Sequence, residues 1–300
     1  MSINSITDSP RKKIVIISNP ISGNKAGQHK LKKVIKELQH LKIQIDIYET
    51  KAPGDAINLS RAAISNGYDA IVVAGGDGTI NEVANGIVGS QTPMALIPTG
   101  TINLLARELK LPTDPKALAK IIANGPSLAA LPCYVGSSLF LVVASIGFDA
   151  RVINDVSLPL KRAIGQWAYI FAGIKRWFKA PFCQLNLEYK NECHSISGLI
   201  AANGRYYGGQ FSLDTTASVF SPTLDVYIFT GKNRWGLALS IGTILLGMKN
   251  NLKHIKITQT GSLKILSPKD EPVQADGDIV AHTPAIFTRS KQPVYLITST

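Results

Sequence analysis

Cysteine is scarce in this sequence, and its placement argues against disulfide bonds and zinc sites. The three cysteines, Cys133, Cys183 and Cys193, form no Cys-x-x-Cys pair, and the five histidines lack the spacing of zinc ligands. An odd and sparse set of thiols is typical of a reducing compartment. We therefore expect a cytoplasmic protein with free cysteines.

Long hydrophobic runs are also missing. The longest strongly apolar stretch, Trp235–Met248, holds fourteen residues, whereas a membrane-spanning helix needs about 20. The stretch Met1–Arg11 is polar and lacks the apolar segment of a signal peptide. We expect a core helix in the first stretch and a loose leader in the second.

Acidic residues are few: 20 Asp and Glu stand against 32 Lys and Arg, which gives a net charge of +12. Such an excess favours anionic partners, namely nucleic acids, nucleotide phosphates or acidic lipid headgroups. No helix-turn-helix, zinc-finger or RNA-binding strand motif is present, so we expect no nucleic-acid binding. With 45% hydrophobic and 17% charged residues among 300, the composition is globular and allows two domains.

The first third of the chain alternates strand and helix signals, the pattern of a parallel sheet with helices on both faces. Ligands bind such sheets beyond the carboxyl ends of the strands. We expect Asp55 and Asp114 to cap helices, the second with proline at the first helical position. The predicted strands are 13–18, 43–48, 70–74 and 94–97, and the predicted helices are 31–41, 55–65, 79–88, one from about Thr101 and one from Pro115.

After about Leu131 strands follow one another without regular crossover helices, which predicts a second, mostly antiparallel domain. Helices are expected at about 160–178 and 234–248. The predicted strands are 139–146, 183–189, 195–202, 224–229, 254–259, 263–266, 278–281, 284–288 and 293–298.

The strongest chemical signal is the string Ala74-Gly75-Gly76-Asp77-Gly78-Thr79, which follows a predicted strand and precedes Asn81 and Glu82 on a helix. Glycines let the backbone approach a phosphate closely, and the N–H groups of a helix N-terminus favour an anion. An aspartate there would repel phosphate unless a cation bridged them, so Asp77 is a candidate Mg²⁺ ligand or substrate-orienting group. The alternative is an ordinary tight turn capped by Asp77.

Polar turns follow three other predicted strands, at 19–25, Thr50 and 98–103. Each turn alone is a common turn sequence. Several such loops at the carboxyl ends of one sheet suggest a shared phosphate pocket. The candidate phosphate-binding residues in these turns are Asn19, Lys25, Thr50, Gly100, Thr101 and Asn103.

A last motif, Asp276-Gly277-Asp278, places two carboxylates around a glycine. Asp-Gly is a strong signal for a hairpin turn, and that is the plainest interpretation. The functional alternative is a base that accepts the proton of a hydroxyl nucleophile.

Together these motifs resemble the diacylglycerol kinase and sphingosine kinase superfamily, especially its bacterial lipid kinases. The resemblance runs from about Lys12 to the C-terminal strands. The Gly-Gly-Asp-Gly-Thr string is highly specific within that superfamily, and so is Ser145-Ile146-Gly147-Phe148-Asp149-Ala150. Shorter matches are Leu160-Lys161-Arg162 with Gly165 and Tyr169, and the segment 202–209.

The resemblance implies an α/β fold with a Rossmann-like, parallel-sheet nucleotide-binding domain over 12–130. A mostly antiparallel β-sandwich over 131–300 would bind the lipid, with the active site in the cleft between, and the last strands are candidates for packing back on the first domain. The resemblance also implies ATP contacts at Asn19, Thr50, the loop from Gly75 to Asn81, and Thr101.

The superfamily's Asp-Gly-Glu proton acceptor maps to Asp276 and Asp278. The second acid is Asp here and reaches one methylene less far, so the identity of the base is open, with Asp276 preferred. Bacterial relatives also hold a structural Mg²⁺ with an acidic pair, but the matching stretch 215–222 carries no carboxylate. We expect that metal to be lost, since Asp214 and Asp225 would both have to turn inward to replace it.

The implied reaction is transfer of the γ-phosphoryl group of ATP, with Mg²⁺, to a primary alcohol of diacylglycerol, a sphingoid base or a related lipid. Asp77, Asp276 and Asp278 would be the catalytic residues. Two alternatives stay open: an NAD kinase, which shares the glycine loop, and a non-catalytic lipid-binding protein. The Gly100-Thr101-x-Asn103 motif argues against the first, and the retention of all three carboxylates argues against the second.

A membrane contact is a further expectation. Basic and aromatic residues alternate between Lys161 and Lys179, a composition that suits an anionic surface such as the inner membrane face. The alternative is an amphipathic helix packed on its own domain. The oligomeric state is open, and a homodimer is compatible with the sequence.

Overall fold

The computed structural model describes residues 5–6, 10–22, 25–155, 184–189, 192–207, 211–213, 217–231, 233, 235–237, 255–266 and 270–299. The chain forms two compact units. Unit 1 comprises Met1–Pro132 and Lys291–Thr300, and unit 2 comprises Cys133–Ser290. The helices expected at 160–178 and 234–248 lie outside the described residues, apart from 235–237.

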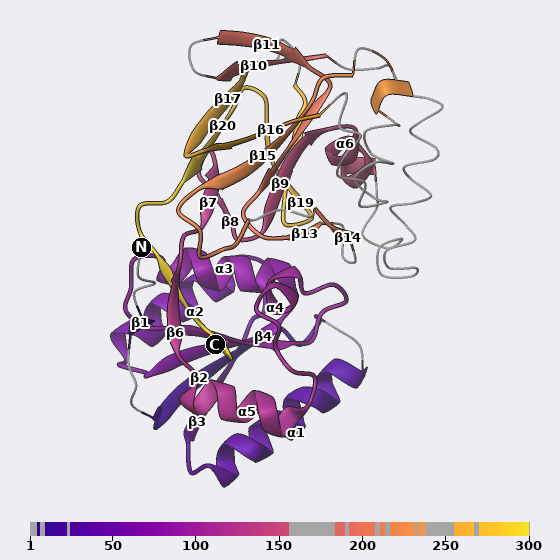
Figure 1. The fold of residues 1–300 in the computed structure, drawn as a ribbon. Coiled ribbons are helices and arrows are strands. Elements are labelled where there is room, and N and C mark those ends of the chain that lie inside the picture. Colours follow the sequence, from indigo (N-terminus) through magenta and orange to yellow (C-terminus); the bar gives the residue numbers. More distant parts are fainter. Residues whose placement is uncertain are drawn as a thin grey trace. The chain divides into compact units, whose positions relative to one another are not determined.

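Unit 1 is a seven-stranded sheet in the order β1-β6-β21-β5-β4-β2-β3. Strands β2 to β5 pair in parallel, whereas β6 runs antiparallel to its neighbours. Helices α2 and α3 lie together on one face, and α1 and α5 on the other (Figure 1). The strands are β1 (Ser5–Ile6), β2 (Lys13–Ser18), β3 (Gln44–Glu49), β4 (Ala70–Gly75), β5 (Met94–Pro98), β6 (Ser127–Ala130) and β21 (Val294–Ile297), and the helices are α1 (Lys25–His40), α2 (Asp55–Ser65), α3 (Asp77–Ile87), α4 (Leu104–Glu108) and α5 (Pro115–Asn124).

The central strands β2 and β4 are buried on both faces, as their apolar composition predicts. Successive side chains of a strand alternate between faces, so Ile14 and Ile16 of β2 share one core with α1. Leu31, Val34 and Leu38 meet that core because their spacing places them on one side of the helix. The sheet is therefore a well-packed base for the loops that leave its carboxyl edge.

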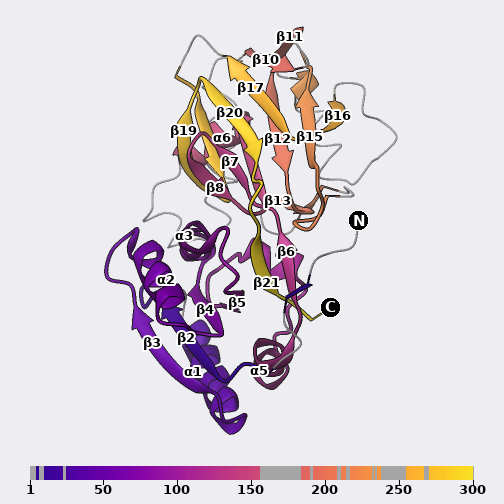
Figure 2. The same ribbon diagram turned by 90° about the vertical axis from the view of Figure 1, so that its left-hand side faces the viewer.

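Unit 2 contains two six-stranded sheets, the two-stranded sheet β13-β14 and helix α6 (Figure 2). The sheet orders are β11-β10-β17-β20-β7-β8 and β16-β15-β12-β9-β18-β19, and every pairing is antiparallel. The elements are β7 (Cys133–Val135), β8 (Ser138–Phe140), β9 (Val143–Gly147), α6 (Phe148–Asp155), β10 (Leu185–Tyr189), β11 (Glu192–Ile196), β12 (Gly198–Ala202), β13 (Tyr206–Tyr207), β14 (Phe211–Ser212), β15 (Leu224–Phe229), β16 (Ile255–Thr260), β17 (Ser262–Leu266), β18 (Pro272–Ala275), β19 (Asp278–His282) and β20 (Ala285–Arg289).

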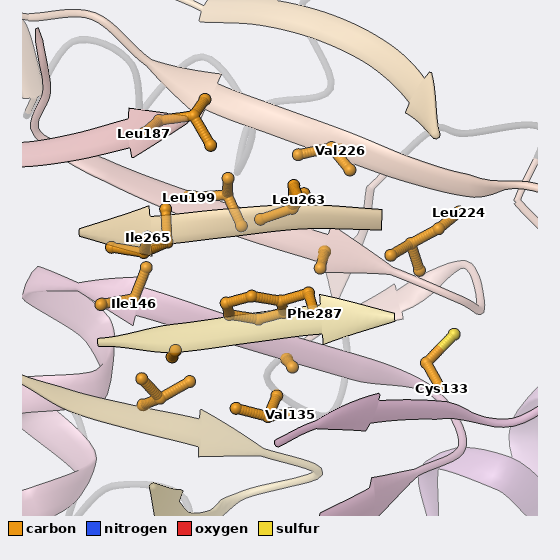
Figure 3. Packing of buried hydrophobic residues seen from close by; sticks show 14 of the residues in the cluster. Cys133, Val135, Ile146, Leu187, Leu199, Leu224, Val226, Leu263, Ile265 and Phe287 are labelled. Carbon is orange, nitrogen blue, oxygen red and sulfur yellow. The ribbon is translucent and has the colours of Figure 1, made fainter. Parts of the chain in front are cut away.

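One hydrophobic core joins the two sheets of unit 2. Figure 3 shows Leu263, Ile265 and Phe287 of the first sheet near Ile146 and Leu199 of the second. The shared core makes unit 2 a β-sandwich. The predicted fold class, a parallel-sheet α/β domain followed by an antiparallel β-sandwich, is confirmed.

Two helix starts differ from expectation. Asp114 caps α5 as predicted, because its carboxylate accepts the Ala117 N–H at 2.7 Å. Asp55 does not cap α2: it is the first helical residue, and its carboxylate accepts the N–H groups of Lys51 and Ala52 in the preceding turn. The helix expected from Thr101 begins at Leu104 because the preceding residue, Asn103, has a left-handed backbone with φ 52°.

Two predicted strands of unit 2 are each divided. The range 139–146 splits into β8 and β9, which belong to different sheets, so the chain crosses between sheets at Leu141 and Val142. The range 195–202 splits at Ser197 between β11 and β12 for the same reason. Cys133 and Cys193 are free thiols as expected, while Cys183 lies outside the described residues. Among the helices that the structure describes, none is long and apolar enough to cross a membrane.

Candidate active site

Three loops meet at the carboxyl edge of the unit 1 sheet, because β2, β4 and β5 are parallel neighbours. We call residues 19–22, 75–79 and 98–103 the loop cluster. Asn19 joins the first two loops: its backbone N–H donates to Ala74 O (3.0 Å) and its Nδ2 donates to Thr79 Oγ1 (3.1 Å). Residues 23 and 24 of the predicted first turn lie outside the described residues.

Two glycines of the loop cluster, Gly75 and Gly100, leave no room for a side chain. A Cβ on Gly100 would lie 2.7 Å from the Cα of Gly76, and a Cβ on Gly75 would lie 2.7 Å from the Cβ of Thr79. Real Cβ atoms essentially never lie so close to another atom. A larger residue at either position would therefore force the surrounding loop atoms to move. The glycine pattern thus has a packing cause in addition to any role in phosphate binding.

Asp77 fastens the glycine loop to the third loop. Its Oδ1 accepts the Leu104 N–H (2.8 Å) and its Oδ2 accepts the Asn103 N–H (3.1 Å), so it caps α4 instead of its own helix. Asn103 closes the loop further, since its side-chain amide donates to Gly100 O (2.6 Å) and accepts from Gly100 N (3.2 Å). We call this arrangement of Asp77, Gly100, Asn103 and Leu104 the clasp. The role of Asp77 as a metal ligand stays a prediction.

Two predicted residues contact other parts of unit 1. Thr50 is buried directly after β3, and its N–H donates to Ser18 O (2.9 Å). Glu82 accepts the Ala56 N–H at the start of α2 (3.2 Å) and so ties α3 to α2. The other predicted residues differ in exposure: Lys25, Gly78 and Thr101 are exposed and Asn81 is partly buried.

Thr99, which the sequence analysis does not single out, lies within the third loop. It is 4% exposed, and its hydroxyl has no hydrogen-bond partner in the part of the protein that the structure describes. A Cβ on Gly27 would lie 3.0 Å from Thr99 Cβ, so the residue is pressed against the first turn of α1. A buried hydroxyl without a partner is costly, which makes Thr99 a candidate ligand contact. The sequence signal that could have indicated Thr99 is its position inside the polar turn 98–103.

In unit 2 the residues 276–278 form the turn between β18 and β19, in which Ala275 lies opposite Asp278. Asp276 and Gly277 both have positive φ, 46° and 95°. Positive φ at both central residues is what a two-residue hairpin turn of the Asp-Gly type requires. The hairpin interpretation is therefore confirmed. We call residues 276–278 the Asp-Gly-Asp turn.

The carboxylate of Asp276 points into the protein and is 8% exposed. It accepts the N–H groups of Leu141 (2.7 Å), Val142 (3.1 Å) and Val143 (2.8 Å), the residues at which the chain crosses between sheets. Asp276 thus satisfies three backbone donors that a buried crossing would otherwise leave unpaired. Asp278, by contrast, is exposed at the start of β19.

A polar network lies beside this turn. Asp149 Oδ2 accepts from Tyr207 OH (2.6 Å) and from Ser145 Oγ, and Gln274 Nε2 donates to Ser145 Oγ (2.6 Å). Burial raises the pKa of the Asp149 carboxyl, and the hydrogen bonds from Ser145 and Tyr207 oppose that rise. Burial and the Asp149 charge raise the pKa of Tyr207 well above its usual range. The 145–150 motif pointed to this region without assigning a role to its residues.

Arg289 binds backbone oxygens at the end of the stretch 215–222, where bacterial relatives are expected to hold a structural Mg²⁺. Its guanidinium donates to Ser221 O, to Thr223 O (3.2 Å) and to Asn203 Oδ1 (2.5 Å). Asp225, 3% exposed, is near enough to interact electrostatically with Arg289, and Asp214 lies outside the described residues. No group of three or more His, Cys, Asp or Glu side chains comes together within the described ranges.

We expect Arg289→Met to lower the free energy of unfolding by roughly 2–4 kcal/mol, because it removes several hydrogen bonds of a charged donor from partly buried oxygens. Arg205→Met is the matched control, since Arg205 is exposed and its bond to Ala217 O is long (3.4 Å). Millimolar Mg²⁺ should leave the melting temperature of the nucleotide-free protein unchanged. A rise in that temperature with Mg²⁺ would show that a structural metal site survives.

Comparison with known proteins identifies both units. Residues 13–132 match the family model described as the diacylglycerol kinase catalytic domain. Residues 142–298 match the one described as the YegS C-terminal NAD kinase beta sandwich-like domain. A protein named diacylglycerol kinase from Mycobacterium tuberculosis (strain H37Rv) is 30% identical over 285 residues, 91% of each chain. One of the same name from Staphylococcus carnosus is 28% identical over 296 residues, 96% of this chain and 95% of the other.

Solved structures share the fold. Two from Bacillus anthracis str. Sterne have TM-scores of 0.80 and 0.74 at 24% and 22% identity, and each comparison covers 97% of this chain and 98% of the other. A protein from Pseudomonas putida named "Probable lipid kinase YegS-like" is 30% identical over 262 residues, 85% of this chain and 88% of the other. The domain pair and these relatives define a kinase of the lipid-kinase class. More narrowly, the chain belongs to the diacylglycerol kinase family.

Proposed function

We propose that the protein transfers the γ-phosphoryl group of ATP to a hydroxyl of a lipid alcohol, with diacylglycerol as the first candidate. The observation that carries this proposal is the clasp, which holds two glycine-containing loops together at the carboxyl edge of a parallel sheet. That edge is where sheets of this kind bind nucleotides. The names of the relatives supply the acceptor class.

The loop cluster has groups that suit a nucleotide and its metal. Helix α3 begins after Gly76 without a side-chain cap, so its N-terminal N–H groups and dipole favour a phosphate. The Thr99 hydroxyl is a second candidate contact. Mg²⁺ is often held by one or two carboxylates together with substrate phosphates, and Asp77 is a carboxylate in the right loop. Bound there, Mg²⁺ would offset the charge that develops during phosphoryl transfer.

We assign the proton acceptor to Asp278, which reverses the order preferred from the sequence. Asp276 uses both carboxylate oxygens on the amides of residues 141–143 and is nearly inaccessible. A base must come within hydrogen-bond reach of the proton it removes. Asp278 is exposed, so its carboxylate is accessible to a lipid hydroxyl. It follows Asp276 by two residues in a turn that the hydrogen bonds of Asp276 hold in place.

A lipid-panel assay with labelled ATP tests the proposal. We expect label transfer to diacylglycerol or a sphingoid base and none to NAD. The NAD assay addresses the main rival, because the sandwich domain carries an NAD kinase-like description. Label on NAD alone would replace the lipid kinase proposal, and ATP binding without transfer to any acceptor would favour a non-catalytic lipid-binding protein.

We further propose a transient contact with an anionic membrane surface by a cytoplasmic enzyme. The basic and aromatic segment that motivated this idea, 161–179, lies outside the described residues. Among the described residues, helix α1 supports the proposal because it exposes positive charges that would attract an anionic surface. These are Lys25, Lys32, Lys33 and Lys36. Sedimentation with vesicles tests it: binding that does not depend on the anionic lipid content would argue against an electrostatic contact.

A further inference from the structure

A continuous chain of hydrogen bonds in unit 2 ends on the Asp-Gly-Asp turn. Tyr207 OH and Ser145 Oγ donate to Asp149 Oδ2, and Gln274 Nε2 donates to Ser145 Oγ. Gly277 N–H then donates to Gln274 Oε1 at 3.0 Å. The chain links β13, the β9–α6 junction and β18 to the peptide that separates the two carboxylates of the turn.

The two ends of this chain set the direction of its bonds: the Asp149 carboxylate can only accept, and the Gly277 N–H can only donate. Ser145 therefore donates its hydroxyl proton to Asp149, and its oxygen accepts a hydrogen bond from Gln274. Gln274 therefore turns its NH₂ group to Ser145 and its carbonyl oxygen to Gly277. If the amide were reversed, its NH₂ would face the Gly277 N–H, and two donors cannot bond.

Water cannot easily replace these contacts. Ser145 and Gln274 are 0% and 1% exposed, so a lost partner would leave a buried polar group unsatisfied. The Asp-Gly sequence already favours the hairpin turn. The turn type therefore does not depend on this chain of hydrogen bonds. What the chain determines is the orientation of the peptide group that carries the Gly277 N–H.

We propose that Asp149, Ser145 and Gln274 are positioning residues for phosphoryl transfer. They fix the Gly277 peptide and thereby the direction in which the Asp278 side chain leaves the turn. This inference rests on the proposed function, in which Asp278 accepts the proton of the lipid hydroxyl. A displacement of a catalytic group by about 1 Å can cost about 10²-fold in rate, so a remote hydrogen bond of this kind can control turnover.

The kinetic test compares Asp149→Asn, Gln274→Met and Ser145→Ala with Ser197→Ala, a buried serine of the same unit outside the chain. We expect the first three to lower kcat by about 10- to 100-fold with the KM for ATP nearly unchanged. The control should keep the wild-type kcat. In a double-mutant cycle, Asp149→Asn should add little once Ser145 is alanine, because Asp149 is linked to Gln274 through the Ser145 hydroxyl. Independent, additive losses would point to general destabilisation and would overturn the proposal.

A second measurement does not depend on activity. In ¹H–¹⁵N spectra of the full chain, the Gly277 amide should shift and exchange faster with solvent in Asp149→Asn and Gln274→Met, and should stay as in the wild type in Ser197→Ala. An unchanged Gly277 amide in folded variants would overturn the inference. If the wild type phosphorylated no lipid, the proposed function would fail, while the Gly277 amide would still decide whether the chain orients the turn.

Discussion

We expect Asp278→Asn to lower kcat for lipid phosphorylation by about 10²- to 10⁴-fold, the range that general-base catalysis contributes, and to leave the melting temperature close to that of the wild type. The reason for the unchanged stability is that Asp278 is exposed at the first position of β19, so an asparagine there remains in contact with solvent. ATP binding, which we assign to unit 1, should be unaffected. Initial rates, ATP titration and thermal melting check these three statements.

Asp276→Asn, two residues earlier in the same turn, is the matched comparison. An asparagine at 276 can accept from some of the amides of residues 141–143, but its NH₂ group faces a donor. At least one buried N–H then loses its partner, at a cost of about 1–3 kcal/mol. We therefore expect a lower melting temperature together with lower activity. If Asp276→Asn were as stable as the wild type and inactive, while Asp278→Asn kept its activity, the acceptor would be Asp276.

Local patterns in the sequence predicted the parallel strands β2 to β5 of unit 1, but they did not predict β1 or β6. Runs such as Lys13–Ser18, which is apolar from Ile14 to Ile17, are typical of strands covered on both faces, and β2 is buried from its second residue onward. Asp114 before Pro115 marked a helix start for a purely local reason, and α5 begins there. Asp55 failed as a cap because the nearby amides of Lys51 and Ala52 compete for the same carboxylate.

Long-range partners were not readable from the sequence. Nothing near Leu141 indicates that its strand breaks, because the carboxylate that accepts its N–H is 135 residues away in the chain. The same holds for Asp77, which was expected to cap its own helix or hold a metal and instead caps α4, a contact across 26 and 27 residues. Motifs thus identified the candidate residues, while the burial of Asp276 and the exposure of Asp278 could be seen only in the tertiary structure.

Asp77→Asn should lower turnover by about 10²-fold, the scale of a lost electrostatic contribution to the transition state. The variant should fold with a small loss of stability, because an asparagine keeps one acceptor for α4 but presents its NH₂ group to the other N–H. Each carboxylate oxygen has more than one lone pair, so the two amide bonds leave Asp77 able to coordinate a cation as well. We therefore expect the Mg²⁺ concentration that gives half-maximal rate to rise in this variant.

Asn103→Gly distinguishes two effects of Asp77: holding the clasp together and binding Mg²⁺. Glycine tolerates the left-handed backbone at position 103 and keeps the N–H that donates to Asp77, but it loses both side-chain bonds to Gly100. This change loosens the loop without removing the carboxylate, so the KM for ATP should rise while the half-saturating Mg²⁺ concentration stays at the wild-type value. If Asp77→Asn showed the same signature as Asn103→Gly, Asp77 would act only by holding the two loops together, and the nucleotide phosphates would have to retain Mg²⁺ with other ligands.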